Sequence, residues 1–109
     1  MTHKPGREFD ALVAERVMGW PKAYDAEADV WYSITADEIP RYSTDIAAAW
    51  EVVGHLTQMP GFNSIDLRIE PDCVIAEAWI YSRAKTVEGD TAPHAICLAA
   101  LAAVEEKAR

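Results

Sequence analysis

The sequence has few glycines, few prolines and few cysteines. Its 109 residues include 5 Gly, 6 Pro and 2 Cys, which excludes a collagen-like chain, a low-complexity chain and a disulfide scaffold. Half of the residues are hydrophobic, and a chain of this length can bury roughly two thirds of its unfolded surface. We therefore expect one globular domain over residues 1–109, with residues 1–6 as a flexible N-terminal tail.

Long apolar runs are also missing. No stretch approaches the roughly 18 consecutive apolar residues that read as a membrane span, and the start, MTHKPGREFD, lacks the apolar core of a signal peptide. The sequence predicts a cytosolic protein without a membrane partner. Cys73 and Cys97 lie in apolar segments, so both are expected to be buried, reduced thiols.

Basic residues are in the minority. Ten Lys and Arg stand against 18 Asp and Glu, which gives a net charge of −8 and an isoelectric point near 4.7. Binding to a phosphate backbone gains affinity from clustered Lys and Arg, which displace its counterions. We therefore expect no nucleic-acid partner.

No catalytic, metal or cofactor motif is present. His3, His55 and His94 are scattered, without the spacing of a zinc or calcium site, and the chain has no P-loop, G-x-G-x-x-G or G-x-S-x-G. We expect no metal, no cofactor and no enzymatic activity. A small hydrolase that uses Glu77 or Asp90 with His94 is the least favoured function, because no nucleophile is paired with a base.

Three helices follow from apolar periodicity. Residues 7–19 form an amphipathic first helix, which ends at Gly19 and Pro21. The second begins after Pro40 with Ser43 as its N-cap, and its expected buried stripe is Ile46, Ala49, Trp50, Val53 and Leu56. The third starts at Asp90 or Thr91 with Pro93 in its first turn. Since it is apolar on every side over residues 95–104, it should be the most buried helix.

The strands are predicted from β-branched and alternating patterns. Residues 30–34 form a short strand, while residues 65–69 and 73–81 form an antiparallel hairpin around a turn at residues 70–72. Val74, Ala76, Ala78 and Ile80 share one face, which suits close packing against helices. The acidic region around residues 25–38 and the polar residues 82–90 are expected to be loops. The fold class is α+β, a compact sandwich of about three helices against a small, largely antiparallel sheet with a central hairpin.

Three segments carry a resemblance to a known family. ALVAERVMGW (residues 11–20), YSTDIAAAWEV (residues 42–52) and DTAPHAICLAAL (residues 90–101) resemble the signature segments of the phage α/β/α-sandwich domain family. The resemblance extends from about Phe9 to Val104; the start of the chain and the acidic insert at residues 25–29 do not match. It implies a small cytosolic protein of bacteriophages and prophages. The family's name describes a fold and not a reaction.

Two of these segments also suggest a binding site. Both begin a predicted helix, and the free N–H groups of a helix start bind phosphate or carboxylate groups. If the two starts converge, they would form a site for a small anion with a base-like part that stacks on an aromatic ring. The candidate ligand-binding residues are Arg41, Tyr42, Ser43, Thr44, Thr91, His94 and Trp31.

A plainer interpretation accounts for the same residues. Ser43 and Thr91 are then ordinary helix caps, and His94 is a surface helix residue. Asp45 and Asp90 would also repel an anion unless they turn aside. Trp20, Trp50 and Trp79 are expected to belong to the core, whereas Trp31 is the tryptophan that is best placed to stack on a ligand.

Of two possible functions, the sequence favours the first, and the second is the alternative. The first is a non-enzymatic phage accessory protein that binds or sequesters a small anionic, nucleotide-like molecule, such as a signalling nucleotide of host defence. The second is an interaction protein, in which exposed aromatics and a self-complementary sheet face bind a host or phage protein or build a homo-oligomer. A large apolar patch without a convergent polar pocket would favour the second.

Overall fold

The described part of the chain folds into three helices, a three-stranded sheet and a separate hairpin. The computed structural model describes residues 3–19, 22–25, 30–33 and 39–107. Its elements are α1 (Arg7–Arg16), β1 (Lys22–Asp25), β2 (Val30–Ser33), α2 (Ile46–Leu56), β3 (Phe62–Ile69), β4 (Val74–Ile80), β5 (Arg83–Gly89) and α3 (Ala92–Lys107). The predicted α+β sandwich is confirmed.

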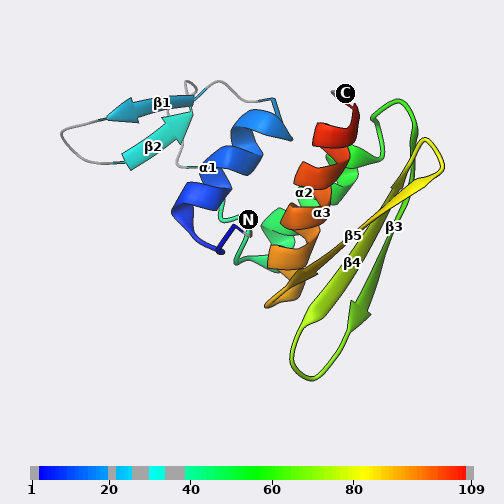
Figure 1. Ribbon diagram of the computed structural model, residues 1–109. Helices are drawn as coiled ribbons and strands as arrows, with labels where there is room; N and C mark the ends of the chain where they lie inside the picture. The colour runs from blue at the N-terminus through cyan, green and yellow to red at the C-terminus, as the bar shows by residue number, and fades with distance from the viewer. Residues whose placement is uncertain (1–2, 20–21, 26–29, 34–38, 108–109) are drawn as a thin grey trace.

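The elements form layers around α3. The sheet, in the order β3-β4-β5, covers one side of α3, and α2 lies alongside that helix (Figure 1). On the other side lie α1 and the antiparallel β1–β2 hairpin (Figure 1). Among the described helices, none is both long and apolar enough to cross a membrane.

The third helix is the centre of the core, as its uniformly apolar sequence predicts. Ala95, Ala99 and Ala103 repeat every four residues and pack with the sheet. A different set of its side chains packs with α1 and α2: Ile96, Cys97, Ala100 and Leu101. Since the helix contributes to both apolar clusters, it has no fully solvated face.

The central hairpin has the predicted faces. β3 and β4 pair antiparallel, and Val74, Ala76, Ala78 and Ile80 of β4 are all buried toward α3. On the opposite face, Trp79 is half-buried, and its Nε1–H donates to Glu77 Oε1 at 2.9 Å. Trp79 is therefore not a core residue but a side chain of the sheet's outer face.

Two predicted loops contain strands. Residues 82–90 include β5, which pairs with β4 from Arg83 to Gly89. β5 is an edge strand, and most of its side chains are at least partly exposed, which allows polar residues in it. The turn before it places Tyr81 and Ser82 at φ of 50° and 63°, the left-handed region that two-residue hairpin turns require. β1 was also not predicted; it ends where the acidic region begins, and it pairs with β2, which corresponds to the strand predicted at residues 30–34.

The second helix buries a different stripe from the one predicted. Its buried residues are Ala48, Ala49, Val52 and Leu56. Trp50, expected in the core, is 53% exposed, and Ile46 is 42% exposed. The helix is apolar nearly all round, so periodicity allowed two stripes. The alanine-containing stripe is the one that faces α3, because small side chains let two helices approach closely.

Close packing of β5 on α3 generates the first prediction. A Cβ atom on Gly89 would lie 2.6 Å from the backbone N of Ala95 and 2.8 Å from its Cα. Gly89→Ala should therefore lower the free energy of unfolding by about 1–3 kcal/mol, the usual effect of overpacking, as measured by urea denaturation. Gly54→Ala is the control, because nothing lies within 4 Å of its Cβ position. Gly54 lies in the last turn of α2, where the change to Ala should raise stability by up to about 1 kcal/mol. Equal effects of the two changes would contradict the packing argument.

Candidate functional site

The second helix starts two residues later than predicted, and its N-cap is Asp45. Asp45 is extended, and its Oδ1 accepts a hydrogen bond from the backbone N–H of Ala47 at 3.1 Å. The preceding residues form a turn in which the N–H of Asp45 donates to the carbonyl of Arg41 at 2.8 Å. The prediction that Ser43 caps this helix is therefore wrong, because Ser43 lies in the turn before it.

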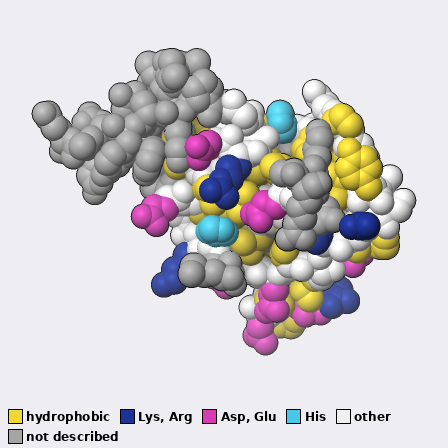
Figure 2. Space-filling view, turned by 45° about the horizontal axis from the view of Figure 1, so that its top comes forward, with side chains coloured by type: hydrophobic (Ala, Val, Ile, Leu, Met, Phe, Trp, Pro, Cys, Tyr) yellow, Lys and Arg dark blue, Asp and Glu magenta, His cyan; other side chains and the backbone are white. Residues whose placement is uncertain are grey.

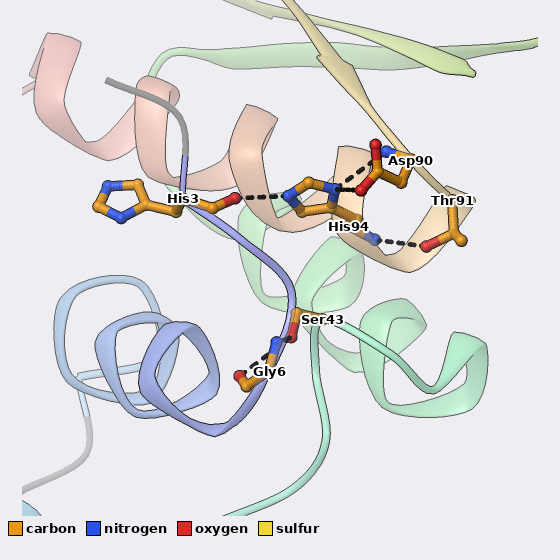
Figure 3. Close-up of polar contacts among 6 residues, drawn as sticks. All are labelled: His3, Gly6, Ser43, Asp90, Thr91 and His94. Carbon is orange, nitrogen blue, oxygen red and sulfur yellow. Dashed lines mark hydrogen bonds and ion pairs between the residues drawn. The ribbon is translucent and has the colours of Figure 1, made fainter. Parts of the chain in front are cut away.

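Ser43 is buried and bonds to the start of α1. Its Oγ–H donates to Asp10 Oδ1 at 2.6 Å, and its backbone N–H donates to the same oxygen at 2.8 Å. The Oγ atom also accepts from the N–H of Gly6 at 2.9 Å (Figure 3). The Asp10 carboxylate thus occupies the two donors of Ser43, which were expected to help bind a ligand anion.

His94 is also buried, which makes its prediction as a surface residue wrong. Its Nδ1 accepts from the N–H of Asp90 at 2.9 Å, so the ring proton lies on Nε2, which donates to the carbonyl of His3 at 2.6 Å (Figure 3). The edge of the ring meets Phe9 with centroids 6.0 Å apart, and His3 stacks on the same Phe9. Both imidazole nitrogens are used within the chain.

The N-terminal segment contacts both helix starts. Residues 3–10 reach His94 through the carbonyl of His3 and reach Ser43 through Gly6 and Asp10. Figure 3 shows the backbone of this segment running between Ser43 and His94. Two of the candidate residues are therefore brought to one region, but their polar groups bind the N-terminal segment.

The other candidate residues divide by exposure. Arg41, Thr44 and Thr91 are exposed. Thr91 is the N-cap of α3, as predicted, since its carbonyl accepts from Ala95 N–H and its Oγ1 accepts from His94 N–H at 3.4 Å. Tyr42 is fully buried, so its ring is not available to stack on a ligand. Trp31 lies in β2, and its side chain is outside the described part of the chain.

Of the two carboxylates in the hydrolase hypothesis, Glu77 lies apart from His94, whereas Asp90 lies beside it. Glu77 accepts hydrogen bonds from Trp79 and from Thr86 Oγ1 at 3.0 Å on the outer face of the sheet. His94 lies on α3, against the N-terminal segment, and its Nδ1 is 4.0 Å from Asp90 Oδ2. Among the described residues, no group of three or more His, Cys, Asp or Glu side chains could hold a metal ion.

Burial controls the titration of two core groups. Tyr42 and Cys97 are fully buried, and desolvation raises the pKa of each to about 12. Glu51 adds to the effect at Tyr42, and Asp10 at Cys97. Cys97 is thus an inert, protonated thiol at neutral pH, as its apolar setting predicted. Cys73 is free and only half-buried, in contrast to the prediction that it is buried.

Sequence reasoning missed two residues of this region. Asp10 is a buried carboxylate on the same side of α1 as Val13 and Val17. An acid within an apolar stripe is the available signal, because a charge on a buried face needs hydrogen-bond donors nearby. Trp50 carried no such signal, since a tryptophan within an apolar helix is typical of a core residue.

Comparisons with known proteins agree with this fold. The model of the phage ABA sandwich domain family matches residues 11–101. The chain is also similar to a phage protein from Bacillus cereus ATCC 14579, known from a crystal structure. The two have 27% sequence identity and a TM-score of 0.73, over 94% of this chain and 93% of the other. A comparison with curated proteins finds no match.

The bonds of Ser43 generate the second prediction. Ser43→Ala removes the Oγ–H donor of the buried Asp10 carboxylate and the acceptor of the Gly6 N–H. The free energy of unfolding should fall by about 1–3 kcal/mol, the usual effect of leaving buried polar groups without a partner. The measurement is urea denaturation, with the exposed Thr44→Ala as control, which should change stability by less than about 0.5 kcal/mol. If both variants are equally stable, the Ser43–Asp10 contact does not hold the N-terminal segment.

The raised pKa values generate the third prediction. Between its ordinary pKa and its folded pKa, each group keeps its proton in the folded state and loses it in the unfolded state. The free energy of unfolding is therefore highest at lower pH and falls as the pH rises through this range. Each group lowers it by at most about 1.4 kcal/mol for every pH unit. Denaturation curves should therefore show a fall from pH 9 to 12 for Cys97 and from pH 10 to 12 for Tyr42. Cys97→Ala should show a smaller fall between pH 9 and 10 than the wild type. A constant stability up to pH 12 would contradict both shifts.

Proposed function

Because this chain belongs to the phage ABA sandwich domain family, we propose that it is a phage accessory protein that binds another protein and catalyses no reaction. The partner is a host or phage protein, and binding takes place in the cytosol of the infected cell. The binding surface is the outer side of α2, defined by Ile46 and Trp50 and called here the α2 patch.

The exposure of Trp50 carries this proposal. Trp50 is 53% exposed and Ile46 is 42% exposed, and their spacing of four residues places them next to each other on the helix surface. Tryptophan is strongly enriched among the residues that dominate the affinity of protein interfaces. An exposed tryptophan beside an exposed isoleucine has no role in the core of this chain, which supports a role in binding.

The surroundings of the α2 patch fit a small interface. Ala47, Glu51 and Gly54 of the same helix are exposed. Small and polar neighbours around apolar anchors resemble the arrangement of a hydrophobic centre with a polar rim. Elsewhere on the surface, Figure 2 shows Lys and Arg side chains lying among Asp and Glu side chains. Because positive and negative side chains are mixed on this surface, we expect the protein partner to be recognised by shape and apolar contact and not by a patch of one charge.

Binding of a small anion, such as a nucleotide signal of host defence, is the second candidate. It is supported by the exposure of Arg41, Thr44 and Thr91 around the two helix starts. It is weakened by Ser43 and His94, whose polar groups already bind the N-terminal segment. The structure thus favours protein binding over the anion site.

One experiment with two arms tests this choice, and it is the fourth prediction. In the first arm, the tagged protein, Trp50→Ala and the control Gln58→Ala, which changes another exposed side chain, are used to capture partners from infected host cells. A protein bound by the wild type and by Gln58→Ala should be lost with Trp50→Ala. With the purified partner, the Kd should rise by at least about thirtyfold, as for an interface residue worth about 2 kcal/mol.

The second arm measures melting temperature with orthophosphate, mononucleotides and cyclic dinucleotides. The protein-binding role predicts no shift, because only a ligand that binds the native state raises stability. A shift that Arg41→Ala abolishes would favour the anion site instead. Equal capture by Trp50→Ala and by the wild type would exclude the α2 patch.

A further inference from the structure

The two edges of the three-stranded sheet differ in chemistry. β3 and β5 are the edge strands. On β5, Arg83 and Lys85 pair with Ile80 and Ala78, so these cations share the core-facing side of the sheet. Inward-facing charges on an edge strand hinder pairing with another chain. β3 has apolar residues on this side, namely Ile65, Leu67 and Ile69. The β3 edge therefore lacks the protection that β5 has.

The open hydrogen-bonding groups of β3 belong to these same apolar residues. At the β3–β4 turn, the N–H of Glu70 donates to the carbonyl of Cys73 at 2.9 Å. Hydrogen-bonded and non-hydrogen-bonded pairs alternate along an antiparallel ladder. It follows that Arg68 and Asp66 bond to β4, whereas the N–H and C=O groups of Ile65, Leu67 and Ile69 point away from the sheet. No described strand pairs with this edge.

The apolar side chains of β3 are also incompletely covered. α3 packs on β4 and β5, with its alanines against Val74, Ala76 and Ala78. On β3, which α3 covers less, Ile65 and Leu67 remain half-buried, and Ile69 is 75% exposed. An additional strand beside β3 would cover the side chains that α3 leaves accessible.

We propose that a second copy of this chain pairs with the β3 edge, antiparallel and centred on Leu67. Leu67 then faces Leu67 of the second copy, and Ile65 faces Ile69 of the second copy. The three strands of each copy form one continuous sheet, with the helices of both copies on the same face. The paired segment is residues 64–70, which lies between the irregularity at Asn63 and the turn at Pro71. This contact involves no residue of the α2 patch and does not depend on its function.

Charge complementarity selects this centre. With Leu67 on the twofold axis, Asp66 lies opposite Arg68 of the second copy, and Arg68 lies opposite the second Asp66. These are non-hydrogen-bonded pairs, in which side chains lie closest. A centre one residue earlier would place Asp66 against Asp66, and a centre one residue later would place Arg68 against Arg68. Both alternatives bring like charges together, which disfavours them.

The fifth prediction tests the contact by exchanging these charges. The mass of the purified protein is measured by analytical ultracentrifugation over a wide range of concentrations. The wild type should reach twice the chain mass. Asp66→Arg and Arg68→Asp should each raise the dimer Kd by about tenfold or more, because attraction becomes repulsion at two symmetric pairs. The double variant Asp66→Arg, Arg68→Asp should bring the Kd back toward the wild-type value, since each pair between the copies again has opposite charges, while the ion pair of Arg68 Nε with Glu70 Oε2 at 3.1 Å within each copy is lost.

Two features make the result specific. Asp66→Arg changes the net charge from −8 to −6, since a base replaces an acid. A smaller net charge would strengthen an unspecific association of the chains. The proposed pairing predicts instead that this variant dimerises more weakly. Glu88→Lys makes the same change of charge on β5 and should leave the Kd unchanged. Melting curves of all variants establish that they are folded. A wild type that stays monomeric, or a dimer that is insensitive to Asp66 and Arg68, would overturn the proposal. Either of these two outcomes leaves the capture experiment with Trp50→Ala unaffected, because that experiment tests a different surface.

Discussion

The close approach of α3 to the sheet is the constraint on which the rest of the structure depends. The contact is made by small side chains on both surfaces: Ala95, Ala99 and Ala103 on the helix, and Ala76 and Ala78 on β4. Gly89 completes it, where even a methyl group would meet the backbone of Ala95. Small side chains bring the two layers together, so each buried methyl contacts many atoms. With one face of α3 used in this way, the other face must bury α1 and α2.

This constraint extends outward to α2. Beside α3, the second helix buries Ala48 and Ala49 together with Val52 and Leu56, while Ile46 and Trp50 lie on the opposite, exposed side. Trp50 and Ile46 are thus exposed as a consequence of how the core is packed. An exposed tryptophan has a large apolar area without a partner inside the chain, which is the physical basis for assigning α2 a role in binding.

The region around Ser43 and His94 illustrates how a chain satisfies its own polar groups. Helix starts and nearby hydroxyls attract anions because their donors have no partner inside the helix. Here Asp10 supplies the anion, and the carbonyl of His3 accepts the imidazole proton. These contacts connect residues that are more than 30 positions apart in the sequence. They hold the N-terminal segment against the core. The α2 patch and the β3 edge are the two surfaces for which we propose partners.

The sequence by itself determined the elements whose patterns are periodic and local. These are the three helices, the β3–β4 hairpin, the buried face of β4, the start of α3 at Asp90 or Thr91 and the central place of α3 in the core. Each follows from the spacing of apolar residues or from the chemistry of a helix start. The tertiary structure alone decided which stripe of α2 is buried, that β5 is a strand, and that Ser43 and His94 bind the N-terminal segment. The reason is physical: an all-apolar helix has no preferred face, a polar edge strand needs a neighbour to become a strand, and a hydroxyl or an imidazole does not encode its distant partner.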